Sequence, residues 1–486
     1  MVSRPIDVVI MAAGKGTRMK SALPKVLHRL GGKPLLQHVI DTAAQLNARQ
    51  AVVITGHESV VVQNAINTIA TQAINTPATD QKSIYSQIKS VLQEPQHGTG
   101  HAVQQAAPVL PDDGMVLVLS GDVPLTEVST LQALIAASGG TQLALLTIDF
   151  PNPTGYGRVM RKDGAVDGSA GAVMAIVEQK DANEAQKRIT EIYSGIMAVP
   201  AKLLKGWLAR LDNKNAQGEY YLTDIVKFAV ADGMTVVAHK IDDAAQVAGV
   251  NSPVQLAELE RTYQLRQAQH LMEQGVRIAD PARFDVRGSL TCGQDVEIDI
   301  NCIFAGSVLL GSNVRIGAHC HITNASIADG AVIHPYTHID GEKLGVTVGA
   351  GALVGPFARL RPGAQLGKEV HIGNFVEVKN ATLADGAKAN HLAYLGDATV
   401  GERVNFGAGS ITANYDGANK HRTVIEDDVH VGSNCVLVAP ITLGAGGTVG
   451  GGSTLTKSTG NNALTVSRAK QISIANWQRP AKAGKK

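Results

Sequence analysis

The stretch LVGPFARLRPGAQLGKEVHIGNFVEV, residues 353–378, places an aliphatic side chain at every sixth position. These positions are Val354, Leu360, Leu366, Ile372 and Val378. The same six-residue repeat returns at Ile425, Val431, Leu437, Leu443, Val449 and Leu455. An α-helix repeats every 3.6 residues and a β-strand every 2, so neither gives a period of six. A solenoid does, because each hexapeptide forms one flat side of a coil and points its aliphatic residue inward. We therefore predict a hexapeptide-repeat coil from roughly residue 290 to 457.

Two segments interrupt this six-residue repeat. AKANHLAYLGD, residues 387–397, places His391 among small and apolar neighbours, and ANYDGANKHR, residues 413–422, is too polar to belong to the wall of the coil. A loop ejected from a rigid scaffold is a candidate for function.

The first half of the chain follows another pattern. Short apolar runs at Val8–Met11, Ala51–Ile54 and Val116–Leu119 are typical of buried parallel strands, and each precedes a loop and an amphipathic stretch. This alternation predicts a doubly wound, Rossmann-like α/β domain whose ligand sites lie at the carboxyl ends of the strands.

The change of pattern suggests domain boundaries. We expect a nucleotide-handling domain over residues 1–252, a linking helix over 253–274 with an apolar stripe, and the coil with its tail over 275–486. Polar or Gly/Ala-rich stretches at 72–90 and 163–175 are expected to be surface insertions.

Composition excludes several classes. With 486 residues the chain is too long for one core, and its net charge of +2 and 4% aromatic content give no basic field or stacking platform for nucleic acid. The first apolar run is too short for a membrane span, and no signal-peptide cleavage pattern follows it. The four cysteines are widely spaced, which indicates reduced, packed thiols in a cytoplasmic protein.

A glycine-rich turn follows the first strand, in MAAGKGTRM at residues 11–19. Its small residues allow backbone N–H groups to approach an anion, and Lys15, Arg18 and Lys25 supply positive charge. It is not a P-loop, and Met19 stands where a dinucleotide fingerprint has its third glycine. Taken alone, the turn is equally typical of an ordinary tight turn.

Further motifs accompany it in order. They are LPKVL (23–27), QHGTGHA (96–102), LSGDVPL (119–125), PTGYGR (153–158), IVEQKDA (176–182) and AGVN (248–251). Together they resemble the sugar-nucleotide pyrophosphorylases. With the hexapeptide coil behind them, nearly the whole chain resembles the bifunctional N-acetylglucosamine-1-phosphate uridyltransferase/glucosamine-1-phosphate acetyltransferases, the GlmU type.

The resemblance implies a first site for UTP and N-acetylglucosamine-1-phosphate, which react to UDP-N-acetylglucosamine and pyrophosphate. It assigns contacts to Met11, Ala12, Ala13, Gly14, Arg18, Lys25, Gln93, Gln96, Gly98, Thr99, Ser120, Gly121, Asp122, Gly157, Glu178, Tyr193 and Asn251. Asp122 and Asn251 would hold Mg²⁺, which prefers oxygen ligands. An alternative for Asp122 is a capping carboxylate, and for Lys25 a solvated helix lysine. Tyr193 departs from the family, which has an asparagine there.

The second site centres on His391. A histidine suits the general base that removes a proton from an attacking amine, although a lone histidine is more often structural. The resemblance implies acetyl transfer from acetyl-CoA to glucosamine-1-phosphate, with Asn405 contacting the sugar and supporting His391. It assigns the sugar phosphate to Arg361, Lys379, Tyr394, Asn405 and the loop cation Lys420, and acetyl-CoA to Ala408, Asn414, Tyr415, Ser433, Gly451 and Arg468. Gly451 stands where relatives have alanine.

These observations favour a bifunctional enzyme, and the resemblance implies a homotrimer and a left-handed coil. A monofunctional nucleotidyltransferase with a purely structural coil would not need His391 and a basic ejected loop. A non-catalytic scaffold would not need the glycine-rich turn together with Asp122 and Asn251.

Overall fold

The computed structural model describes residues 4–75, 82–162 and 171–480, and the chain divides into two compact units, Met1–Tyr263 and Gln264–Lys486. The fold class predicted from the sequence, a doubly wound α/β domain and a left-handed parallel β-helix, is confirmed. Within the described ranges, no helix is long and apolar enough to cross a membrane.

The first unit is built on a mixed sheet whose order is β11-β7-β10-β6-β1-β4-β5. The strands are β1 (Ile6–Met11), β4 (Gln50–Thr55), β5 (Ile88–Leu92), β6 (Met115–Ser120), β7 (Leu143–Asp149), β10 (Glu191–Pro200) and β11 (Val236–Ile241). β1, β4, β5 and β6 run parallel, and β10 runs antiparallel to β6 and β7. A side branch of β8 (Gly157–Arg161) and β9 (Val173–Val177) pairs with β10.

Helices cover both faces of this sheet because successive strand residues point to opposite sides. Val8 and Ile10 belong to a buried cluster with α1 (Leu35–Gln45), α2 (Ser59–Asn75) and α5 (Val128–Ser138). Val9 belongs to a second cluster with helices on the other face. Those helices are α4 (Thr99–Ala106), α7 (Ala201–Leu208) and α8 (Ile225–Ala231). The short helices α3 (Lys82–Tyr85) and α6 (Glu184–Lys187) complete the unit.

The parallel strands β1, β4, β5 and β6 end at the same edge of the sheet. Their last residues are Met11, Thr55, Leu92 and Ser120, and each leads into a loop. The backbone N–H of Ala12 donates to Ile54, and that of Gly121 donates to Met11, so the loops lie side by side. This edge is where a ligand site is expected in such a fold.

Residues 76–81 of the insertion expected at 72–90 lie outside the described residues, and for the rest of that stretch the expectation is wrong. Residues 72–75 end α2, residues 82–85 form α3, and Ile88 begins the edge strand β5. Polar composition misled the prediction because an edge strand and a surface helix need apolar residues on one side only. Residues 163–170 of the other expected insertion lie outside the described residues, while Val173–Val177 form β9.

The helix α9 spans Pro253–Glu273 and crosses the division between the units. Leu259 packs with Leu30 and Leu35 of the first unit, whereas Ala268 and Leu271 belong to the buried core of the second. Its two halves therefore serve different cores.

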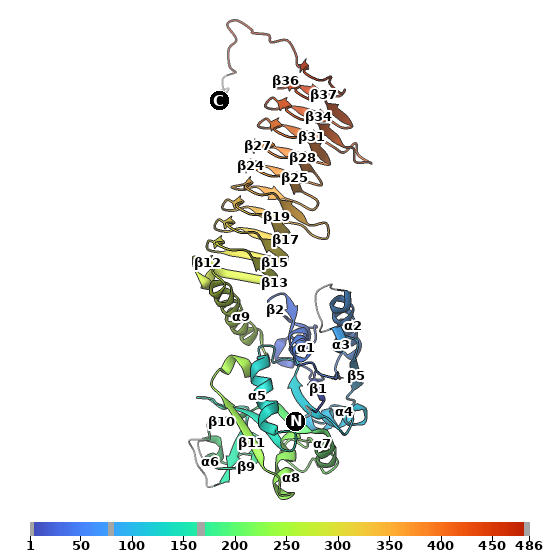
Figure 1. Ribbon diagram of the computed structural model, residues 1–486, viewed down its shortest axis with the longest axis vertical. Helices are drawn as coiled ribbons and strands as arrows, with labels where there is room; N and C mark the ends of the chain where they lie inside the picture. The colour runs from blue at the N-terminus through green and yellow to red at the C-terminus, as the bar shows by residue number, and fades with distance from the viewer. Residues whose placement is uncertain (1–3, 76–81, 163–170, 481–486) are drawn as a thin grey trace, which may run out of the picture. The chain divides into compact units, whose positions relative to one another are not determined.

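The second unit is a coil of short parallel strands, stacked turn upon turn (Figure 1). One face carries β12 (Arg277–Ile278), β14 (Glu297–Ile298), β16 (Arg315–Ile316), β18 (Val332–Ile333), β21 (Leu353–Val354), β24 (His371–Asn374), β27 (Lys388–His391), β30 (Asn405–Phe406), β33 (His430–Val431), β36 (Thr448–Val449) and β38 (Leu464–Thr465). The coil starts before residue 290 and ends after 457, since β12 begins at Arg277 and β38 ends at Thr465. The six-residue repeat is also present in its first turns, at the buried Ile298, Phe304 and Leu310, and part of it lies on longer strands. These are β13 (Phe284–Cys292), β15 (Cys302–Leu310) and β17 (His321–Ile327).

The other two faces share one sheet. One is formed by β19 (His338–Asp340), β22 (Arg359–Leu360), β25 (Glu377–Lys379), β28 (Tyr394–Gly396), β31 (Ile411–Ala413), β34 (Val436–Val438) and β37 (Thr454–Leu455). The last is formed by β20 (Val346–Val348), β23 (Gln365–Leu366), β26 (Thr382–Leu383), β29 (Ala398–Val400), β32 (Thr423–Ile425) and β35 (Ile441–Leu443). Val354, Leu360 and Leu366, which lie on successive faces, are all buried in the core.

Two candidate active sites

The first site is a pocket of about 480 Å³ at the carboxyl edge of the sheet. Its lining includes Met11, Ala12, Ala13, Gly14, Lys15, Lys25, Gln93, Gln96, Gly98, Thr99, Ser120, Asp122 and Glu219. Eleven of the residues assigned by resemblance to the first site therefore meet in one cavity. Of the others, Asn251 contacts Lys25, and Gly121 follows Ser120 in the same loop.

Three polar side chains meet beside the glycine-rich turn. Lys25 Nζ donates to Asp122 Oδ2 at 2.5 Å and to Asn251 Oδ1 at 3.0 Å. The side chains of Lys25 and Asp122 are only 15% and 16% exposed. The backbone N–H of Val250 donates to the Asp122 carbonyl at 2.9 Å, which fixes the AGVN segment against the strand end. Carboxylate and amide oxygens thus converge on one positive charge.

The part of the lining that contains Glu219 depends on a glycine. Gly98 has φ of 103°, and a Cβ there would lie 2.7 Å from the Tyr220 carbonyl oxygen. This approach brings Glu219 into the pocket, a residue that the sequence analysis missed. Its position follows from the backbone bond from Tyr220 N–H to the His97 carbonyl, a contact that no local pattern reveals.

The predicted sugar end lies on the side branch of the sheet. Gly157 pairs with Tyr193, and a Cβ on Gly157 would lie 3.6 Å from Glu178 Oε1, so the three residues are neighbours. Burial raises the pKa of Glu178, while the hydrogen bond from Thr223 opposes this shift. Burial also raises the pKa of Tyr193, whose hydroxyl has no hydrogen-bond partner among the described residues. These three residues do not line the pocket of the glycine-rich turn.

Arg18 lies in a short 3₁₀ turn, Thr17–Met19, directly after Gly16. Both Arg18 and Asp122 influence the pKa of Tyr156, which burial raises, so the three side chains are close together. Tyr156 was not predicted as a site residue. PTGYGR contains it, but the pattern alone did not separate it from its glycine neighbours.

The second site lies on the coil at the end of β27. The exposed His391 lies in register beside Asn374 of the preceding turn, and its Nδ1 is 2.8 Å from Asn374 Oδ1. With an amide oxygen as acceptor, Nδ1 carries the proton and Nε2 is left as the basic nitrogen. Asn405 pairs through its strand with Lys388, and its predicted support of His391 stays a prediction. The strand register, not the sequence motif, selects Asn374.

Three cations gather on the adjacent face. The pKa of Lys379 is lowered, first by the charge of Arg361 and then by burial and Lys420, so the three groups lie close together. Glu377 accepts a hydrogen bond from Arg361 at 2.8 Å and raises the pKa of that guanidinium. Tyr394 pairs with Glu377 on the neighbouring strand. An anion would relieve the mutual repulsion of the cations.

The ejected loop that carries Lys420 is internally braced. Asp416 accepts from the backbone N–H groups of Ala418 at 2.8 Å and Asn419 at 2.6 Å, and it pairs with His421 at 2.7 Å. These bonds hold the pKa of Asp416 below its usual range. At the base of the loop, Asn414 donates to Asp397.

Four of the residues assigned to acetyl-CoA, Ala408, Ser433, Gly451 and Arg468, form a column above His391. Backbone N–H groups connect successive turns, from Gly409 to the His391 carbonyl, from Asn434 to Ala408 and from Gly452 to Ser433. The column ends where Arg468 Nη1 donates to the Gly451 carbonyl at 2.8 Å. Small side chains leave a strip along the corner of the coil. Tyr415 lies in the loop, where its hydroxyl donates to the Gly417 carbonyl.

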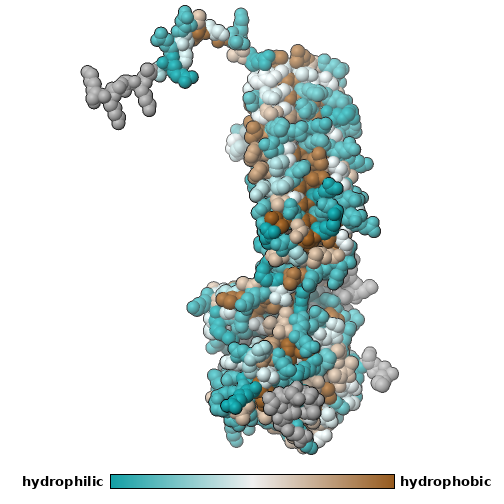
Figure 2. Space-filling model, turned by 90° about the vertical axis from the view of Figure 1, so that its left-hand side faces the viewer, coloured by the Kyte–Doolittle hydropathy of each residue, from teal (hydrophilic) through white to brown (hydrophobic). Residues whose placement is uncertain are grey.

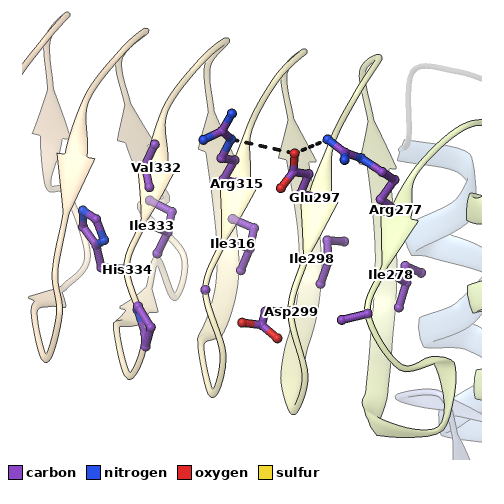
Figure 3. A pocket seen from close by; sticks show the side chains of 13 residues that line it. Arg277, Ile278, Glu297, Ile298, Asp299, Arg315, Ile316, Val332, Ile333 and His334 are labelled. Atoms are coloured by element: carbon purple, nitrogen blue, oxygen red, sulfur yellow. Dashed lines mark hydrogen bonds and ion pairs between the residues drawn. The ribbon is translucent and has the colours of Figure 1, made fainter.

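Another hollow, of about 360 Å³, lies on the first turns of the coil. Figure 3 shows its row of isoleucines beside the charged row of Arg277, Glu297 and Arg315. Glu297 pairs with Arg277 and lies 3.9 Å from Arg315 Nε. None of the predicted site residues lines it, and no group of acids, histidines or cysteines suited to a metal occurs within the described part of the chain.

Comparisons with known protein families match both the α/β unit and the coil. Residues 8–180 match the MobA-like NTP transferase domain, residues 345–380 the bacterial transferase hexapeptide repeat, and residues 422–457 the hexapeptide repeat of succinyl-transferase.

Curated relatives span the full chain. "Bifunctional protein GlmU" of Polaromonas sp. (strain JS666 / ATCC BAA-500) is 72% identical over 100% of both chains. The protein of the same name from Paracidovorax citrulli is 70% identical over 98% of both, and that from Polaromonas naphthalenivorans is 72% identical over 99% of both. The chain therefore belongs to the GlmU family of bifunctional proteins.

Proposed function

We propose that the two reactions of this bifunctional enzyme run at the two sites described above. Uridylyl transfer from UTP to N-acetylglucosamine-1-phosphate takes place at the sheet-edge pocket. Acetyl transfer from acetyl-CoA to glucosamine-1-phosphate takes place beside His391. The observation that carries this assignment is the separation of two different chemical sets. One unit has a pocket in which carboxylate and amide oxygens surround an ammonium group, and the other has an exposed, oriented imidazole.

Uridylyl transfer joins two anionic reactants, so positioning and charge neutralisation supply most of the catalysis. A phosphate oxygen of the sugar phosphate attacks the α-phosphorus of UTP, and pyrophosphate leaves. Backbone groups of Ala12, Ala13 and Gly14 hold the nucleotide phosphates, and Arg18 faces the leaving pyrophosphate. Gln93 and Gln96, which line the same pocket, read the uracil edge.

Asp122 and Asn251 are the proposed Mg²⁺ ligands. Their oxygens fit a hard cation, because both already accept from one ammonium group at 2.5 and 3.0 Å. When bound, the ion neutralises charge on the phosphates. Asn251 is held for this role by a bond from its N–H to Gln255 at 2.9 Å.

The sugar of N-acetylglucosamine-1-phosphate is assigned to Gly157, Glu178 and Tyr193. The buried carboxyl of Glu178 is suited to accept hydrogen bonds from a polyhydroxylated ligand. The buried hydroxyl of Tyr193, which has no partner among the described residues, is suited to donate one.

Acetyl transfer needs a base and an anion site. The amine nitrogen of glucosamine-1-phosphate attacks the thioester carbonyl, its proton passes to Nε2 of His391, and the C–S bond breaks to release CoA. The phosphate lies among Arg361, Lys379 and Lys420, whose mutual repulsion favours an anion. The column above His391, which ends at Arg468, offers a path for the pantetheine arm and a cation at its far end.

We further propose a homotrimer built through the coils. His391 lies open on the surface, and the neighbouring corner carries a stack of Tyr336 on Phe357 at 5.0 Å and of Phe357 on Phe375 at 5.4 Å. The three rings are 51%, 48% and 56% exposed, and Figure 2 shows hydrophobic surface along one side of the coil. An exposed apolar ridge of this kind favours an interface.

Two assays on the purified full chain test the assignment of activities. Incubation with acetyl-CoA and glucosamine-1-phosphate should release free thiol, and incubation with UTP, Mg²⁺ and N-acetylglucosamine-1-phosphate should release pyrophosphate. Pyrophosphate release without thiol release would favour a monofunctional nucleotidyltransferase with a structural coil. Light scattering at micromolar concentration should give the mass of three chains, and a monomer would contradict the trimer.

A further inference from the structure

The ammonium group of Lys25 occupies the position between the proposed metal ligands. It lies 2.5 Å from Asp122 Oδ2 and 3.0 Å from Asn251 Oδ1, the same two oxygens that would coordinate Mg²⁺. Mg²⁺ holds its oxygen ligands at about 2.0–2.1 Å in a near-octahedral shell. An ammonium group and the metal ion therefore cannot use these oxygens at the same time.

The two oxygens belong to braced parts of the fold. The carbonyl of Asp122 accepts from Val250 N–H at 2.9 Å, and Asn251 is fixed through its N–H and through its Nδ2, which lies 3.4 Å from the Gly249 carbonyl. The backbone that carries each oxygen is therefore held by bonds that do not involve Lys25.

Apart from the two bonds of its ammonium group, Lys25 is held at the root of its side chain. It begins the 3₁₀ turn Lys25–Leu27, and its Cβ would lie 2.7 Å from a Cβ added at Gly16, so its stem packs against the glycine-rich turn. Beyond this stem the side chain is a flexible four-carbon arm that ends in the pocket beside Gly14. The arm can reach phosphates in that pocket without a change in the backbone.

We propose that Lys25 is a built-in stand-in for the metal ion: it neutralises Asp122 in the free enzyme and must be displaced before a divalent cation binds. This inference rests on the proposed role of Asp122 and Asn251 as metal ligands. The nucleotide supplies the new partner for Lys25, since its phosphates offer negative charge within the same pocket.

Two consequences follow. The free enzyme binds a divalent cation weakly, because the ion competes with an internal cation. Nucleotide and metal bind cooperatively, because the phosphates draw Lys25 away from Asp122, and this coupling is reciprocal. A buried hydrogen bond to a charged group is commonly strong enough to lower affinity for a competitor by about tenfold to a hundredfold.

The test measures binding of Mn²⁺ alone to the full chain, by electron paramagnetic resonance of the free ion and without nucleotide. Lys25→Met should bind Mn²⁺ at least about tenfold more tightly than the wild type. Lys15→Met is the matched control, because it removes a cation from the same pocket and leaves the Asp122 contact intact. It should change the affinity by less than about threefold. Adding Asp122→Asn to Lys25→Met should abolish the gain.

The outcomes separate the two proposals. If wild type and Lys25→Met bind Mn²⁺ equally well and Asp122→Asn loses this binding, the stand-in role of Lys25 is overturned and the metal site is kept. Unchanged affinity on Asp122→Asn in both backgrounds would overturn the metal site and the inference with it. An equal gain in Lys15→Met would reduce the effect to general charge and also overturn the inference.

Circular dichroism would reveal whether Lys25→Met folds. If it does not, a second measurement still tests the proposal. In the wild type, a non-hydrolysable UTP analogue should tighten Mn²⁺ binding more than it does in Lys25→Gln. Equal tightening in the two proteins would contradict displacement of the lysine.

Discussion

The Nδ1 atom of His391 lies 2.8 Å from Oδ1 of Asn374, one turn earlier in the coil. The two residues face each other because the turns are in register, with His371 beside Lys388 and Asn374 beside His391. The amide holds the ring and sets its tautomer, so the imidazole proposed as general base is oriented by a residue in the regular wall of the coil.

Removal of this amide should therefore slow acetyl transfer. Asn374→Leu is expected to lower kcat for thiol release by about tenfold to a hundredfold, since the ring loses its orientation and tautomer. The pyrophosphate assay of the other unit serves as the internal control and should be unchanged. Full thiol-release activity in Asn374→Leu would show that His391 needs no partner.

The ejected loop should act through Lys420. Asp416→Ala removes the acceptor of two backbone N–H groups and of His421, which loosens the loop. KM for glucosamine-1-phosphate should rise severalfold while kcat changes little, because the binding of the phosphate is weakened. Steady-state kinetics decide this, with Lys420→Ala as the reference for complete loss of the cation. A fall in kcat at constant KM would argue against a positioning role.

Gly98 should be intolerant of any side chain. At φ of 103°, Gly98→Ala brings a Cβ to 2.7 Å from the Tyr220 carbonyl and costs at least about 1–2 kcal/mol. A lower melting temperature of the first unit and a raised KM for UTP are expected.

Gly206 offers the matched control on α7, since a Cβ there meets nothing within 4 Å among the described residues. Gly206→Ala should raise stability by up to about 1 kcal/mol, because alanine favours the helix. Equal effects of the two substitutions would show that the backbone at Gly98 is not constrained.

The raised pKa of Glu178 should appear in the pH dependence of stability. Burial favours the protonated carboxyl in the folded state, so the folded chain binds this proton more tightly than the unfolded chain, whose value is near 4.5. The stabilisation that Glu178 contributes is fully present below the unfolded-state pKa and is lost as the pH rises through the folded-state pKa.

Glu178→Gln should therefore flatten the fall in melting temperature of the first unit as the pH rises from 4.5. Glu184→Gln, at an exposed side chain on α6, should leave the curve unchanged. A steeper fall in Glu178→Gln would mean that the carboxyl is held ionised.

The sequence predicted the coil, the sheet-edge pocket and the exposed His391 because each leaves a local signal. Val354 and Ile372 repeat at a fixed interval, and Gly14 and Asp122 follow apolar strands. Asn374, the hydrogen-bond partner of His391, left no such signal in the sequence. It lies within the regular six-residue repeat and meets the histidine only through the register of the turns.

Contacts between distant segments also escaped prediction. Lys25 and Asn251 meet across most of the first unit, and Glu219 enters the pocket through backbone pairing with the segment of His97. Their motifs suggested a role for Lys25 and Asn251 but not that they touch each other. Composition alone misassigned the described part of residues 72–90, because the alternation of an edge strand is short and weak.

The central claim is that two independent sites share one chain, and paired substitutions test it most directly. Thiol release and pyrophosphate release are measured on His391→Ala and Asp122→Ala, each with its own substrates. His391→Ala should lose thiol release and keep pyrophosphate release at the wild-type rate, and Asp122→Ala should show the reverse. Loss of both activities in either folded variant would contradict two independent sites.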